Sequence, residues 1–153
     1  MKRIELPLGL LFSNTGPYGT VAPTLLNGAR LACAEINADP ESGVTFHPIH
    51  IDPKGILQTY APAVQSLFDR GIHHVCGCYT SSSRKEVIPL FEKHDALLWY
   101  PTHYEGFESS TNVIYTGAAP NHHMSPLIDF LCSRFGRRAY CVGSNSIWGW
   151  ESN

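Results

Sequence analysis

Short apolar runs alternate with amphipathic stretches along this chain. Residues 4–12 are rich in Leu and lead into a polar loop, and residues 24–37 repeat apolar side chains at helical spacing. Along the whole chain, the pattern predicts four helices, over residues 24–37, 58–70, 83–94 and 125–135. It also predicts six strands, over residues 4–12, 44–51, 72–76, 96–100, 112–116 and 139–142. Alternating strands and helices are typical of a mostly parallel sheet that is covered on both faces. We therefore expect a three-layer α/β lobe of flavodoxin-like or Rossmann-like type.

The third predicted helix carries two local signals. Ser83 and Glu86 have the spacing of a capping box, which predicts that Ser83 caps the helix. Pro89 lies inside the same helix and removes one backbone hydrogen bond, so we expect a kink or a loosened first turn.

Hydroxyl side chains follow the third predicted strand, at residues 79–83, and lead into this helix. Sheets of this kind bind ligands at the carboxyl ends of their strands. A helix N-terminus also offers unpaired N–H groups that suit a carbonyl or carboxylate oxygen. One serine is needed to cap the helix, but Ser81 to Ser83 are three in a row. We expect at least one of them to contact a ligand.

Aromatic residues follow the fourth predicted strand, with four of them among the nine residues 99–107. Aromatic walls with a few polar groups are typical of small-molecule pockets. Packing against neighbouring helices is expected for Trp99 and Phe107. Tyr100 and Thr102 are the stronger candidates for a pocket.

The run GCYTSSSRKEVIPLFEKHDALLWYPTHYEGFESSTNVIYTGAAPNHHMSPL resembles the amide-binding regulators of bacterial aliphatic amidase operons. It is also similar to the urea-binding proteins of ABC importers, and both groups belong to the type I periplasmic-binding-protein superfamily. The resemblance implies two α/β lobes that clamp a ligand between them. It implies polar ligand contacts at Ser81 and Thr102, walls at Tyr79 and Tyr100, and a further candidate at Tyr104.

Two features depart from this family. Where it reads G-S-D-Y-x-aromatic-P, the chain has GSNSIWG at residues 143–149, so Ser146 replaces an expected aromatic residue and Trp148 is the candidate to fill the gap. Relatives also continue into a second lobe beyond Asn153. We therefore expect residues 1–153 to form an incomplete N-terminal ligand-binding lobe, truncated before the second lobe. Such a lobe should bind ligand weakly and self-associate through uncovered apolar surface.

Composition narrows the function class further. The 153 residues carry a net charge of -2, and no run of Lys or Arg exceeds a pair, which disfavours nucleic-acid binding. No apolar stretch is long enough to span a membrane. The five Cys residues are an odd, scattered set, which favours reduced thiols and a cytoplasmic location. A periplasmic location remains the alternative if a signal peptide lies upstream of this chain.

The Cys and His residues near the third predicted strand also allow a catalytic or a metal-binding interpretation. Cys78 could be a thiolate nucleophile at a helix N-terminus, but neither a G-x-S-x-G nor a C-x-x-C pattern is present. His74, Cys76 and Cys78 could share one face of a strand as metal ligands, although a buried parallel strand gives the same pattern. We expect no enzyme activity, no catalytic residue, no metal site and no cofactor.

The sequence thus predicts a small-molecule binding lobe for a short aliphatic amide or urea-like ligand. The first hypothesis is a cytoplasmic sensor that acts on a regulatory protein partner to control amidase-type gene expression. The alternatives are the substrate-binding component of an ABC importer for urea, amides or branched-chain amino acids, acting with its permease, or a non-functional truncated remnant of either. The exact ligand and the oligomeric state stay open.

Overall fold

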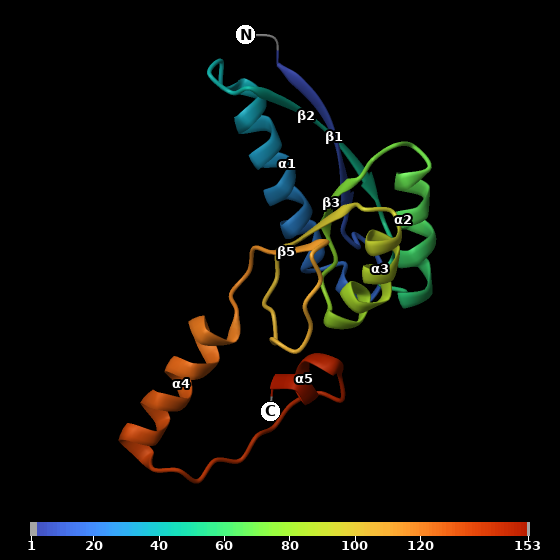
Figure 1. Ribbon diagram of the computed structural model, residues 1–153. Helices are drawn as coiled ribbons and strands as arrows, with labels where there is room; N and C mark the ends of the chain where they lie inside the picture. Colours follow the sequence, from blue (N-terminus) through green and yellow to red (C-terminus); the bar gives the residue numbers. More distant parts are fainter. Residues whose placement is uncertain (1–2, 153) are drawn as a thin grey trace.

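A five-stranded, all-parallel sheet forms the centre of the computed structural model, which describes residues 3–152 (Figure 1). The strand order is β2-β1-β3-β4-β5. The strands are β1 Ile4–Leu11, β2 Val44–Ile51, β3 His74–Gly77, β4 Leu97–Tyr100 and β5 Val113–Tyr115. Each begins and ends within one residue or two of a predicted strand.

Helices cover both faces of the sheet, so the predicted three-layer arrangement is confirmed (Figure 1). One face carries α1, which packs through Leu26 onto Leu10 and Phe12. The other face carries α2 and α3, and their apolar side chains enclose the larger core around Val75 and Leu98. The helices are α1 Ala22–Ala38, α2 Tyr60–Phe68, α3 Ser81–Lys93, α4 Pro120–Phe135 and α5 Ile147–Ser152, with 3₁₀ turns at Gly16–Tyr18 and Leu57–Thr59.

The predicted sixth strand, residues 139–142, is wrong. This segment has no regular secondary structure and pairs with no strand, and Tyr140 and Val142 are 92% and 85% exposed. An apolar run forms a strand only when a neighbouring strand accepts its backbone hydrogen bonds, and none lies beside it among residues 3–152.

Helix α4 begins at Pro120, earlier than predicted, since Pro at the first helical position needs no hydrogen-bond acceptor for its nitrogen. It extends away from the sheet and has no buried residue (Figure 1). Its apolar side chains Leu127, Ile128, Phe130, Leu131 and Phe135 are exposed. Self-association through this surface stays a prediction.

Helix α3 is capped by Thr80, and the prediction of Ser83 as the cap is wrong. The Thr80 side chain accepts a hydrogen bond from the Ser83 N–H at 3.1 Å, and the Thr80 N–H donates to Ser83 Oγ at 3.2 Å. Ser83, the third residue of the helix, therefore takes the place that glutamate has in the usual capping box. The helix runs on through Pro89 to Lys93, and this reciprocal pair holds its first turn.

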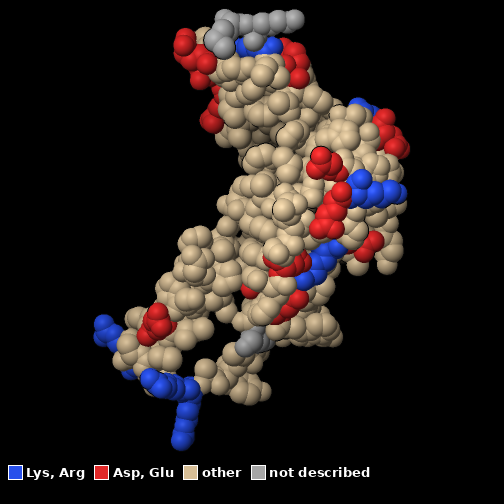
Figure 2. All heavy atoms as spheres, in the orientation of Figure 1, with Lys and Arg blue, Asp and Glu red and all other residues tan. Residues whose placement is uncertain are grey.

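Charged side chains are sparse on the visible face of the molecule. Figure 2 shows small groups of Lys and Arg, one beyond α4 and others beside acidic side chains, on a face that is mostly uncharged. None of the described helices is long and apolar enough to cross a membrane.

Candidate functional site

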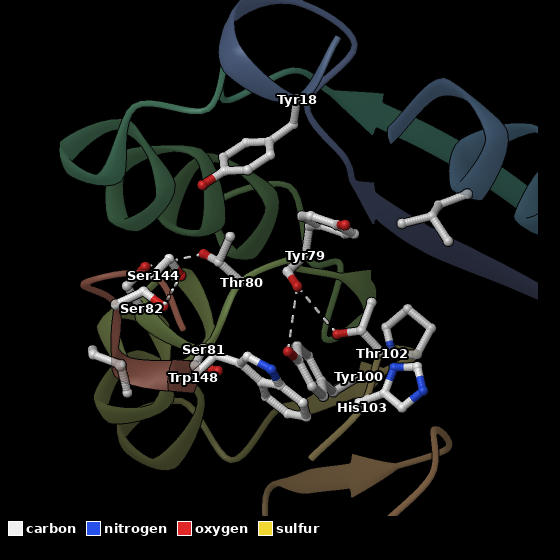
Figure 3. Close-up of a pocket in the computed structure, with 14 residues that line it drawn as sticks. Tyr18, Tyr79, Thr80, Ser81, Ser82, Tyr100, Thr102, His103, Ser144 and Trp148 are labelled. Carbon is white, nitrogen blue, oxygen red and sulfur yellow. Dashed lines mark hydrogen bonds between the residues drawn. The ribbon is translucent and has the colours of Figure 1, made fainter. Parts of the chain in front are cut away.

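A cavity of about 670 Å³ opens at the carboxyl edge of the sheet (Figure 3). Three segments supply most of its wall: residues 79–82 after β3, residues 100–103 at the end of β4, and residues 144–148 before and within α5. Tyr18 and Leu25 complete it from the region after β1. The strands β3 and β4 are neighbours and parallel, so the turns that follow them emerge at the same edge.

Four of the five residues predicted to bind ligand line this one cavity: Tyr79, Ser81, Tyr100 and Thr102. Tyr104 does not line it. The Tyr104 ring stacks on Tyr115 with the centroids 3.9 Å apart, and its hydroxyl accepts the Glu108 N–H at 2.9 Å. The Tyr104 backbone N–H donates to the Ala118 carbonyl at 2.9 Å, and this bond holds the residue where its side chain packs beside Tyr115 outside the cavity. The turns after β3 and β4 thus bring together four of the side chains that the resemblance implies, and Tyr104 is the exception.

The backbone carbonyl of Tyr79 joins the two turns. It accepts the Thr102 hydroxyl at 3.2 Å and the Tyr100 hydroxyl at 3.4 Å, as the dashed lines in Figure 3 show. Burial raises the pKa of Tyr100, so this phenol stays protonated and remains a donor at neutral pH. The two turns are thus held in a fixed relation by hydrogen bonds as well as by the sheet.

Ser81 begins α3 and connects the cavity to a buried ion pair. Its hydroxyl donates to Glu105 Oε2 at 3.1 Å, while Arg84 Nη2 donates to Glu105 Oε1 at 2.5 Å. The side chains of both Arg84 and Glu105 are fully buried. Arg84 also pairs with Glu108, and its guanidinium carbon lies 4.6 Å from the centre of the Tyr100 ring. Burial opposes ionisation of Glu105, but pairing with Arg84 outweighs it and lowers the pKa of that carboxyl.

Sequence reasoning missed several cavity residues because no single motif marks them. Tyr18 lies in the loop after β1 and packs against Tyr79, with ring centroids 5.3 Å apart. His103 also lines the cavity, and its ring lies 6.0 Å from that of Trp148. Trp148 and Ser146 line the same wall, as the expectation that Trp148 fills the gap at Ser146 requires. The general rule that loops after parallel strands carry ligands could have indicated the Tyr18 loop.

The structure separates the three residues considered as metal ligands. His74 and Cys76 face an apolar groove beside Trp99. Cys78 has a positive φ of 63°, which breaks the strand alternation and turns its side chain into the core on the α2–α3 face. Within residues 3–152, no three His, Cys, Asp or Glu side chains are placed to hold a metal ion.

Cys78 should react slowly with a thiol reagent at neutral pH. Its side chain is fully buried, and burial raises its pKa to about 12, so almost none of it is thiolate. The exposed Cys132 and Cys141 provide internal controls and should be labelled first. Mass spectrometry of peptides over a labelling time course measures the order. Labelling of Cys78 in the folded protein at the rate of Cys132 would contradict the buried position.

Residues 6–153 match a family described as periplasmic binding protein domain. Among solved structures, the chain is similar to a branched-chain amino acid transporter substrate-binding protein from Streptococcus pneumoniae in complex with isoleucine (TM-score 0.72, 19% identity, 87% of this chain and 39% of that one). It is similar to a leucine-binding protein from Thermotoga maritima (TM-score 0.72, 13% identity, 86% and 38%). A solute-binding protein of an ABC transporter from R. palustris, in complex with 4-hydroxybenzoate, also matches (TM-score 0.68, 14% identity, 86% and 36%). The chain therefore spans less than two fifths of the length of these proteins, and at such identities the likeness shows the fold.

Proposed function

We propose that the cavity of this chain, which belongs to the periplasmic binding protein domain family, binds a short aliphatic amide or urea-like molecule. In this proposal the chain is the ligand-binding lobe of a sensor that regulates amidase-type gene expression. The family consists of binding proteins, in agreement with the prediction that the chain is not an enzyme. One observation carries the choice of ligand: hydroxyl groups and open helix N–H groups lie on the same small cavity.

An amide presents one carbonyl oxygen and one N–H₂ group, and the cavity offers partners of both kinds. The first N–H groups of α3, those of Ser81 and Ser82, meet no acceptor among residues 3–152 and suit the ligand carbonyl. The hydroxyl oxygens of Ser81 and Thr102 suit the ligand N–H₂. The rings of Tyr18, Tyr79 and Tyr100 supply apolar walls for a short aliphatic group.

In the sensor proposal, a second lobe closes over the ligand and the closed form acts on a regulatory protein partner. A ligand favours closure when it contacts both lobes, since it then binds the closed form better than the open one. All five Cys residues are free thiols, which supports a cytoplasmic location because thiols persist in reducing compartments.

A second candidate function is the substrate-binding component of an ABC importer. The three similar solved structures favour it, since all are transport or ligand-binding proteins and one holds isoleucine. A ligand panel separates the candidates in part. Binding of isoleucine in preference to acetamide, butyramide and urea would favour amino acid import.

Acetamide should bind to this chain with a millimolar dissociation constant, measured by ¹⁵N NMR titration of the Ser81 and Ser82 amides. A millimolar dissociation constant corresponds to a binding free energy of about 4 kcal/mol, and a micromolar constant to about 8 kcal/mol. We expect the smaller value, because this lobe supplies about half of the ligand contacts of a two-lobed site. Thr102→Val should weaken binding by about fivefold, since one hydrogen bond contributes about 1 kcal/mol.

Thr116→Val is the matched control for Thr102→Val. It removes the same kind of hydroxyl, which donates to the Tyr100 carbonyl at 3.1 Å from outside the cavity. The control should bind acetamide as the unmodified chain does. Equal affinities for the Thr102 variant and the unmodified chain would contradict the proposed contact, and absence of any shift at Ser81 and Ser82 would contradict the proposed function.

A further inference from the structure

Three hydroxyl groups of the cavity, those of Ser81, Tyr100 and Thr102, donate their hydrogen atoms to acceptors of the protein itself. Thr102 and Tyr100 both donate to the Tyr79 carbonyl, and Ser81 donates to the Glu105 carboxylate. A carbonyl and an ionised carboxylate accept hydrogen bonds and cannot donate them, and each hydroxyl has a single hydrogen. The direction of all three hydrogen bonds is therefore fixed, and each oxygen offers only its lone pairs to the cavity.

Glu105 fixes the direction of the Ser81 hydroxyl, and Arg84 keeps Glu105 ionised. The two carboxylate oxygens have separate partners: Oε1 accepts from Arg84 at 2.5 Å and Oε2 accepts from Ser81 at 3.1 Å. Pairing with the buried guanidinium lowers the pKa of Glu105, so the carboxyl holds no proton to give back to Ser81 at neutral pH.

We infer that Glu105 is a positioning residue that sets the ligand class of the proposed amide site. By holding Ser81 as a hydrogen-bond acceptor, it makes the cavity select an N–H donor at this point and reject a carboxylate of the same shape. This inference rests on the proposed function and adds to it the group that decides between an amide and the corresponding acid. A carboxylate oxygen placed against Ser81, Thr102 and Tyr100 would meet lone pairs only.

Glu105→Gln should reverse the Ser81 hydroxyl. Arg84 can only donate, so the glutamine oxygen must face Arg84, and the glutamine N–H₂ then faces Ser81. Ser81 would accept from residue 105 and turn its own hydrogen toward the cavity. Because the size of the side chain is unchanged, the variant alters the direction of one hydrogen bond and leaves the cavity shape intact.

The test is an NMR titration of the unmodified chain and two variants with acetamide and with acetate. We expect the unmodified chain to prefer acetamide over acetate by about tenfold or more. Glu105→Gln should reduce this preference by about tenfold, because the contact with Ser81 becomes unfavourable for the amide N–H₂ and favourable for a carboxylate oxygen. Glu108→Gln is the matched control. Glu108 also pairs with Arg84, but it contacts no cavity hydroxyl, so its variant should keep the preference for acetamide.

The ratio of the two affinities separates positioning from simple structural damage, since damage lowers both affinities together. An unchanged ratio in Glu105→Gln, with acetamide still bound by the unmodified chain, overturns the role of Glu105 and leaves the proposed function standing. The same loss of ratio in both variants also overturns it. Failure of the unmodified chain to bind either compound overturns the proposed function and this inference with it.

Discussion

Replacing Arg84 with methionine should lower the free energy of unfolding by about 3–5 kcal/mol. The Arg84 side chain is fully buried and pairs with Glu105 and Glu108. Removing it leaves the Glu105 carboxylate buried without its cation. Hydrogen bonds such as the one from Ser81 remain, but the charge interaction that offset the cost of burying the carboxylate is lost. Urea denaturation followed by circular dichroism measures the change.

Lys85→Met is the control for this prediction. Lys85 pairs with Glu108 at 2.9 Å and Glu151 at 3.1 Å, but its side chain is 29% exposed. Partly exposed pairs contribute about 0–1 kcal/mol, so the control should lose no more than that. A double variant, Arg84→Met with Glu105→Gln, should recover part of the stability because it removes the unpaired charge. Equal losses for Arg84→Met and Lys85→Met would show that the buried pair does not stabilise the fold as described.

Gly117→Ala should destabilise the chain by about 3 kcal/mol and abolish measurable acetamide binding. A Cβ atom on Gly117 would lie 2.0 Å from the backbone carbonyl oxygen of Thr102, so the turn after β4 must move. That turn carries one of the proposed amide contacts. Urea denaturation and the NMR titration measure the two effects.

Gly28→Ala provides the comparison for this substitution. Gly28 lies inside α1, and an added Cβ there meets no atom within 4 Å. Alanine is favoured over glycine inside a helix by about 1 kcal/mol, so this variant should be slightly more stable and bind acetamide normally. Normal binding by Gly117→Ala would mean that the turn tolerates displacement, which would weaken the argument for a precisely placed Thr102.

The apolar pattern predicted the sheet well because five of its runs pair as neighbouring parallel strands. It failed at residues 139–142, since periodicity records which side chains are apolar and carries no information on whether a partner strand is present. It also gave no sign that Arg84 is buried. A charged residue is expected at the surface, and only the three-dimensional arrangement brings Glu105, Glu108 and three tyrosine rings around it.

The candidate site was predictable as far as strand order determines it. The turns after β3 and β4 carry Tyr79, Ser81, Tyr100 and Thr102, and parallel neighbours bring such turns to one edge. Tyr18 lies in a distant segment whose place depends on how its loop folds back, and no motif indicated it. Trp148 was indicated only through the resemblance, as the residue to fill the gap at Ser146. The direction of the Ser81 hydrogen bond depends on Glu105, whose role no local motif records.

Most cavity residues lie on connecting turns, at the last position of β4 or in the first turn of a helix, whereas most residues of the larger core lie within the strands and on the inner faces of α2 and α3. Substitutions that alter ligand preference therefore fall mostly outside the positions where a lost methyl group is costly. Ligand preference can diverge over evolution while the framework is retained. The related solved structures agree with this separation, since one shared architecture accommodates isoleucine in one protein and 4-hydroxybenzoate in another.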